Sequence, residues 1–175
     1  MTTSELIKNY KPKEYKLHIA ISYSNLNELR KDKFLFFKKR GYKFETIISD
    51  IKHYNSKFSP GENSVILESY VQPDARIGHN SLIWSGSIIG HHSIIKNHCW
   101  VSSGTAIGGN SNIDDLSFFG MNSTVGHFVK IGKSCFIGSG SHITKNVKKN
   151  SVVVQPESKI LDFEAKKFLQ IKNFK

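Results

Sequence analysis

An apolar residue returns at every sixth position from residue 65 to residue 143, fourteen times without a break. A period of six matches neither the 3.6-residue turn of an α-helix nor the two-residue alternation of an ordinary strand, but it is typical of a hexapeptide β-helix. A sandwich of short strands would not keep one period for so long. We therefore expect a mainly β fold in which three hexads close each triangular coil. The repeating positions are Val65, Val71, Ile77, Ile83, Ile89, Ile95, Val101, Ile107, Ile113, Phe119, Val125, Ile131, Ile137 and Ile143.

A small side chain lies four residues after each of these apolar residues up to Ile137, except at Val129. Small residues fit the corners of such a coil, and the glycines that often come directly after the apolar residue supply backbone freedom there. Stacked coils lie about 4.8 Å apart, so each residue is expected above the one three hexads earlier. The small set is Ser69, Ala75, Ser81, Ser87, Ser93, Cys99, Thr105, Ser111, Ser117, Ser123, Cys135 and Ser141.

Three regions are expected along the chain: a small α/β lobe with its linker at residues 1–60, the β-helix at 61–157, and a C-terminal helix at 158–175. In the last region, apolar residues recur at helical spacing between lysines, at Ile160, Phe163, Phe168 and Ile171. A helix here would cover the open strand edges at the end of the coil. A basic amphipathic helix on a membrane surface is the alternative.

The lobe itself is expected to be strand, helix, strand. Residues 1–14 are polar and rich in lysine, which predicts a loose arm. Apolar runs at 17–22 and 41–49 predict strands, and the segment between them predicts a helix that Asn25 or Asn27 caps and Gly41 ends. The order is that of a βαβ-like unit. Residues 50–64, which contain Pro60 and Gly61, then predict a linker into the first coil.

The formal net charge of +11 predicts an anionic partner without saying which one. Nucleic-acid binding would depend on this charge alone and is not expected. No stretch approaches the ~20 apolar residues of a membrane span, and the N-terminus lacks the apolar region of a signal peptide, so a cytoplasmic protein is expected. Cys99 and Cys135 lie two coils apart in one column, roughly 9 to 10 Å, which is too far for a disulfide.

Several strings of this sequence resemble the hexapeptide-repeat acyltransferases, and among them the sialic-acid and bacillosamine type of sugar acyltransferase. SGSIIGHHSIIKNHCWVSS and VKIGKSCFIGSGSHITKN resemble their coils, HIAIS and RGYKFETIIS the second half of their N-terminal lobe, and SVVVQPESKI their closing strand and cap. The resemblance implies a left-handed parallel β-helix and a homotrimer with active sites between neighbouring copies. It also implies that acetyl-CoA donates an acyl group to an amine or hydroxyl of a sugar or nucleotide-sugar, with histidine as general base.

The sequence departs from this family at two places. The family's lobe opens with a strand and a glycine-rich loop for the nucleotide, whereas only about fifteen residues without glycine precede HIAIS here. Aligned on VKIGKSCFIG, the family's catalytic histidine falls at Gly109 and its acidic neighbour at Asn110. The usual base is therefore absent.

Histidines flank the vacant position in its own column, which reads Pro73, His91, Gly109, His127. A neutral imidazole with a pKa near 7 is suited to accept a proton from the attacking group. We predict His91 as the base, with His127 second and His92 third. His92 shares a column with Asp74 and Asn110, so it is also a candidate for orienting a neighbour.

The remaining site residues are expected to bind the donor. Backbone N–H groups near Gly108 and Gly126 could stabilise the oxyanion. Lys145, Lys148 and Lys149 are candidate partners for the phosphates of CoA, and Ser139 and Gly140 complete the predicted CoA contacts. The alternative is that these lysines only solubilise the surface. His79, His98 and His142 are expected to be ordinary surface residues.

Two other classes of function stay open at this stage. One is a non-catalytic binding or assembly protein that keeps the fold without the usual histidine. The other is a zinc enzyme similar to β-helix carbonic anhydrases, since His91 and His127 have the spacing of two of its ligands. The third ligand would fall at Gly132, and catalytic zinc requires three protein ligands. No metal is therefore expected.

Overall fold

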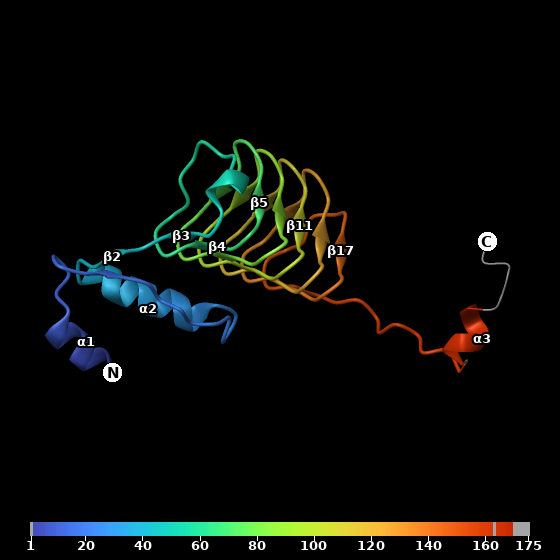
Figure 1. The fold of residues 1–175 in the computed structure, drawn as a ribbon, viewed down its shortest axis with the longest axis horizontal. Helices are drawn as coiled ribbons and strands as arrows, with labels where there is room; N and C mark the ends of the chain where they lie inside the picture. The colour runs from blue at the N-terminus through green and yellow to red at the C-terminus, as the bar shows by residue number, and fades with distance from the viewer. Residues whose placement is uncertain (1, 163, 170–175) are drawn as a thin grey trace.

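The computed structural model describes residues 2–162 and 164–169. Its main body is a three-sided parallel β-helix of about six turns, seen edge-on in Figure 1 as a stack of coils. Two-residue strands form the three faces, and each strand pairs in parallel with the strand one coil away. The mainly β, parallel solenoid expected from the hexads is confirmed, and the left hand of the coil stays a prediction.

The three faces differ in length. The seven-stranded face contains β3 (Ile47–Ile48), β4 (Val65–Ile66), β7 (Leu82–Ile83), β10 (Trp100–Val101), β13 (Phe118–Phe119), β16 (Phe136–Ile137) and β18 (Val152–Val153). The five-stranded face contains β5 (Tyr70–Val71), β8 (Ile88–Ile89), β11 (Ala106–Ile107), β14 (Thr124–Val125) and β17 (His142–Ile143). The four-stranded face contains β6 (Arg76–Ile77), β9 (Ile94–Ile95), β12 (Asn112–Ile113) and β15 (Lys130–Ile131).

The repeated apolar residues point into the coil. Every one of them from Val71 to Ile143 lies in one core cluster and is at most 5% exposed. Each such side chain stabilises the fold by about 1.5–3 kcal/mol relative to exposure. Val65 is the exception: Ile66 takes the inward place, because β4 pairs with a strand only seventeen residues later, Val65 opposite Leu82. The first coil is one residue short, so Val65 packs on the outer surface instead.

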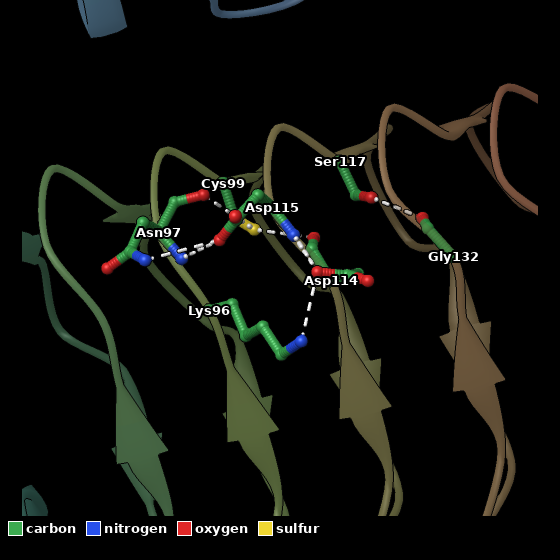
Figure 2. Close-up of polar contacts among 7 residues, drawn as sticks. All are labelled: Lys96, Asn97, Cys99, Asp114, Asp115, Ser117 and Gly132. Atoms are coloured by element: carbon green, nitrogen blue, oxygen red, sulfur yellow. Dashed lines mark hydrogen bonds and ion pairs between the residues drawn. The ribbon is translucent and has the colours of Figure 1, made fainter.

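The small residues at the corners also connect the coils. The Ser81 hydroxyl donates to the Lys96 carbonyl (2.9 Å), and Ser93 donates to Gly108 (2.8 Å). Figure 2 shows two residues of the column of Ser81, with Ser117 donating to Gly132 (3.0 Å) and the Cys99 thiol donating to Asp114 (3.3 Å). A short side chain with a donor therefore satisfies a buried carbonyl fifteen residues further on. Burial raises the pKa of the Cys99 thiol to about 12, and both cysteines are free.

The N-terminal lobe contains α1 (Thr3–Asn9), β1 (Lys16–Leu17), α2 (Glu28–Lys39) and β2 (Lys43–Phe44). β1 pairs in parallel with β2 across α2, which confirms the βαβ-like unit, although both strands are shorter than predicted. The loose arm was the wrong expectation for residues 1–14. Thr2 and Glu5 form a capping box that starts α1, and this helix packs Leu6 and Ile7 against the lobe core.

The β-helix begins earlier than the sequence indicates. The apolar run at 41–49 splits into β2 in the lobe and β3 in the seven-stranded face, where β3 pairs with β4. A 3₁₀ turn, Ile51–His53, follows, and Tyr54 forms a bridge with Val71. Ile48 and Tyr54 pack against the core and cover its first coil. Much of the segment predicted as a linker is therefore an irregular first turn of the helix.

A ladder of amides joins the lobe to the coils. The Ile19 N–H donates to Asn63 Oδ1 (2.7 Å), and Asn63 Nδ2 donates to Asn80 Oδ1 (2.7 Å). The amide nitrogen of Asn80 is thereby left to face His98 Nδ1 at 2.8 Å. His98 must accept this bond, so it is neutral in the native fold. It is a buried structural histidine and not the surface residue that the sequence predicted.

We expect acid to destabilise the protein through His98. Burial lowers its pKa from 6.5 to about 4, with nearby Arg30, Lys31 and His79 acting in the same direction and Asp115 opposing them. The unfolded chain binds the proton below about pH 6.5, whereas the native state binds it only near pH 4. Stability should thus be unaffected by this group above pH 6.5 and fall as the pH drops from 6.5 towards 4.

Urea denaturation at pH 7.5 and pH 5 measures this effect. His98→Asn keeps an acceptor for Asn80 and suits the left-handed backbone at this position (φ 62°), so it should shrink the difference between the two pH values. An undiminished difference in this variant would assign the acid sensitivity to other groups.

The C-terminal segment contains a helix, α3 (Ala165–Leu169), but it does not lie over the last coil. Residues 154–162 are exposed, Ile160 to 94%, and Figure 1 shows α3 at the far end of this extended stretch. The expected cap is therefore not formed by the described residues. Of the residues that predicted the cap, Phe163 and Ile171 lie outside the described residues. Within the described residues, every helix is too short or too polar to span a membrane.

Candidate active site

The predicted histidines gather at the corner between the five-stranded and four-stranded faces. Successive turns there bring His91, Gly109 and His127 into one column, as the period of the repeat predicts. The rings of His91 and His127 have their centroids 6.2 Å apart across Gly109. His91 is half-buried, whereas His127 is exposed.

The imidazole of His91 lies over the place where Gly109 lacks a side chain. A Cβ at this position would come within 2.6 Å of both Cε1 and Nε2 of His91. A larger residue at 109 would therefore displace the ring. Glycine at position 109 therefore makes room for the imidazole of His91, which belongs to the preceding coil.

His92 connects His91 to a carboxylate. Nδ1 of His91 and Nδ1 of His92 are 3.2 Å apart, and Nε2 of His92 lies 3.4 Å from Oδ2 of Asp74. The carboxylate favours a proton on Nε2 of His92, so Nδ1 of His92 accepts a hydrogen bond that Nδ1 of His91 donates. Nε2 of His91 is then left with its lone pair, as a base requires.

The backbone of the corner holds this arrangement. Asp74 and His92 occupy the left-handed position of successive turns, with φ of 60° and 58°. The His92 N–H donates to the Pro73 carbonyl (3.1 Å), and the His91 N–H donates to Oε1 of Gln72 (2.9 Å). A hydrogen bond from Lys57 lowers the pKa of Asp74, and the charges of Lys57 and Arg76 act in the same direction, so this carboxylate is ionised.

A groove of about 350 Å³ runs along the corner beside the histidines. Its wall includes His142, whose Nδ1 is 2.6 Å from the Thr124 hydroxyl. His142 is exposed, as the sequence predicted, and it lines this groove because it lies one coil beyond Thr124 on the five-stranded face. The lining residues are Gln72, Ile88, Gly90, Ala106, Ile107, Gly108, Gly109, Thr124, Val125, Gly126, His127 and His142.

The oxyanion donors predicted near Gly108 and Gly126 are not the N–H groups of these two glycines themselves. Both N–H groups already donate to the next coil, to the carbonyls of Val125 and Ile143, at 2.8 Å each. The N–H groups of Gly109 and His127 have no acceptor within the described part of the chain, and both residues line the groove. These two are the backbone donors that the corner leaves available.

The other predicted contacts of CoA do not lie together. Lys145 is exposed two residues after β17, beyond the end of the histidine column. Lys148 and Lys149 line a separate groove of about 460 Å³ beside β12 and β15. Ser139 lines a third, aromatic groove with Tyr23, Trp84 and Trp100 at the corner between the seven-stranded and five-stranded faces, and Gly140 follows it in the same turn.

No cluster of three or more histidine, cysteine or acidic side chains that could hold a metal ion is found among the residues that the structure describes.

The fold and the corner define the class of the protein: a hexapeptide-repeat parallel β-helix with a histidine cluster on one edge. Residues 61–167 match the family model described as GMPPB C-terminal domain, and the chain belongs to this family. Among curated proteins, none matches the sequence at a significant level.

Two solved structures share the fold. One is WeeI from Acinetobacter baumannii, at 22% identity over 92% of this chain and 77% of that one, with a TM-score of 0.73. The other is a histidine-to-asparagine variant of perosamine N-acetyltransferase from Caulobacter crescentus in complex with CoA and GDP-perosamine, at 19% identity over 85% and 68% of the two chains, with a TM-score of 0.71. The β-helix resemblance drawn from the sequence is confirmed by these neighbours.

Proposed function

We propose that this protein is a CoA-dependent acyltransferase that moves an acetyl or similar acyl group to an amine or hydroxyl of a sugar. The observation that carries the proposal is the line Asp74, His92, His91, which leaves Nε2 of His91 unprotonated over Gly109, a residue that lines the first groove. A carboxylate that orients one imidazole, which in turn orients a second, is an arrangement suited to general base catalysis.

The residues of the corner account for each proton and charge of acyl transfer. The lone pair of the acceptor amine or hydroxyl attacks the thioester carbonyl. Nε2 of His91 accepts the proton that the acceptor loses in this step. The N–H groups of Gly109 and His127 stabilise the resulting oxyanion. When the tetrahedral centre collapses, the C–S bond breaks and the imidazolium of His91 returns the proton to the departing thiolate. His92 and Asp74 stabilise the imidazolium during the cycle.

The groove along the corner suits the long, narrow acyl donor. Glycines at 90, 108, 109 and 126 line the groove and leave room for it, and the exposed Lys145 lies towards its C-terminal end, where a phosphate of acetyl-CoA would gain a cationic partner. Lys148 with Lys149, further round the same end of the coil, provides a second cationic position. A protein that uses acetyl-CoA would work in the cytoplasm, in keeping with two buried free cysteines.

A homotrimer would complete this site. The lobe packs against the outer side of the seven-stranded face, while the five-stranded face exposes Tyr70 and Ile88, each to 44%. Contact between copies through the five-stranded face would bring the histidine corner of one copy near the Ser139 corner of the next. This packing would place the predicted Ser139 and Gly140 beside the donor, although within one chain they lie at a different corner.

Release of the free CoA thiol from acetyl-CoA tests the function. We expect a nucleotide-linked amino sugar or a free sugar, drawn from a panel of both, to drive release, because the perosamine N-acetyltransferase of the same fold was crystallised with CoA and a GDP-linked sugar. Mass spectrometry of the product then separates an amide from an ester. If acetyl-CoA neither binds nor turns over with any acceptor, the protein is a non-catalytic member of the fold.

A further inference from the structure

A second groove, of about 490 Å³, opens on the other side of the histidine cluster. It lies on the four-stranded face near its first strands and is lined by Lys57, Phe58, Asp74, Arg76, His92 and Ile94. His92 and Asp74 therefore belong both to the orienting line of the base and to the wall of this groove. The first groove is lined by Gly109 and His127 instead. His91 lies between the two grooves, in contact with His92 of the second and with Gly109 of the first.

Arg76 gives the second groove its chemical character. Its guanidinium lies 4.0 Å from the ring centroid of Phe58, and it forms no ion pair with any residue that the structure describes. A guanidinium held flat on an aromatic ring keeps the N–H groups along its edge available for two oxygens of an anion.

Lys57 adds a second cation beside it. Its Nζ is 2.7 Å from Oδ1 of Asp74 and 5.3 Å from the ring of Phe58. Asp74 is the only acidic residue that lines the groove, and this single carboxylate is shared between Lys57 and His92. The groove therefore keeps an excess of positive charge even with His92 neutral.

We infer that this groove binds the acceptor through an anionic group, a phosphate or a carboxylate, held by Arg76 and Lys57. The inference rests on the proposed acyl transfer, in which two substrates must reach one base. The first groove, which includes Gly109, is the side for the extended donor, and the basic groove reaches the other side of the histidine cluster at His92. An anion on Lys57 also draws that lysine away from Asp74, which strengthens the hold of the carboxylate on His92.

Phosphate groups occur in CoA as well as in a nucleotide-linked sugar, so the test must separate these sources. Arg76→Gln and Lys57→Gln are compared with Lys96→Gln, which removes an equal charge from the same face. Lys96 pairs with Asp114 at 3.1 Å and lines neither groove, as Figure 2 shows for the pair. Titration calorimetry with uridine diphosphate, inorganic pyrophosphate and free CoA measures binding without turnover, and circular dichroism verifies the fold of each variant.

Arg76→Gln should weaken diphosphate binding by about tenfold or more, the effect of losing charge-assisted hydrogen bonds, and leave CoA binding within twofold. Lys96→Gln should change neither. Where an anionic acceptor turns over, its KM should rise by a similar factor in Arg76→Gln, and the KM for acetyl-CoA should not.

The outcomes keep this inference apart from the proposed function. Diphosphate binding that depends on Arg76, in a protein without acyl transfer, would support the groove and overturn the function. Acyl transfer to an anionic acceptor that is unaffected by Arg76→Gln would overturn the groove. A loss of CoA binding equal to the loss of diphosphate binding would assign the groove to the donor and also overturn the inference.

Discussion

Replacing His91 with alanine is expected to lower kcat for acyl transfer by about 100- to 10,000-fold, the contribution of a positioned general base. Nε2 of His91 is the nitrogen that the line from Asp74 leaves unprotonated, and the loss of this base should affect kcat far more than the KM for acetyl-CoA. Steady-state release of CoA thiol, with melting curves to verify the fold, measures the effect. His127→Ala, which keeps that line intact, should cost much less. A larger loss in His127→Ala than in His91→Ala would make His127 the base.

Gly109→Ala tests the same site in a second way, because it moves the His91 ring instead of removing it. It leaves every histidine in place, but its methyl group would displace the His91 ring from a position 2.6 Å away. The backbone here has no left-handed φ, and the displaced atoms are the far end of a side chain, so the fold should tolerate the change. Normal activity in Gly109→Ala would show that the position of the ring over Gly109 does not matter.

Replacing Arg30 with methionine is expected to lower the free energy of unfolding by about 2–4 kcal/mol, because several buried carbonyls lose their donor. Arg30 is fully buried between the lobe and the coils. Its guanidinium donates to the carbonyls of Asn80 (3.3 Å), His98 (3.1 Å), Cys99 (3.2 Å) and Ile21 (3.4 Å) and lies 5.4 Å from the ring of Trp100. Burial lowers its pKa to about 10, so it remains charged at neutral pH.

Urea denaturation followed by tryptophan fluorescence measures this loss, since Trp100 lies against Arg30. Lys39→Met, an exposed substitution on the same helix, should change the stability by less than about 0.5 kcal/mol. A loss from Arg30→Met no larger than that of the control would mean that the lobe and the coils do not depend on this contact.

The β-helix could be predicted from the sequence because its information is local. Each hexad carries its own inward residue. Because the repeat and the spacing of strands are constant, each residue lies above the one three hexads earlier, and this column rule places residues of different coils together. For the same reason the prediction fails where the repeat changes. In the short first coil, Ile66 takes the inward position in place of Val65. The segment around Tyr54 joins the β-helix although its sequence contains no hexad.

The candidate site was predictable only as a set of positions. The column rule placed His91 and His127 on either side of Gly109, but the direction of a ring depends on the contacts around it. The structure shows the His91 ring over Gly109 and Asp74 in line with His92, and it shows that Gly108 and Gly126 have already used their N–H groups. The places of His142 and Arg76 in grooves were not predicted, because these grooves are formed by side chains of several coils.

The sequence by itself therefore determined the architecture, the core and the corner at which the histidines meet, since a strict period leaves a chain of this kind one way to bury its apolar residues. The tertiary structure alone decided which histidine nitrogen is free to act as a base, how the lobe is held by a buried arginine, and which side chains line the two grooves. These features depend on side-chain directions and hydrogen bonds between residues tens of positions apart, and no repeat in the sequence encodes them.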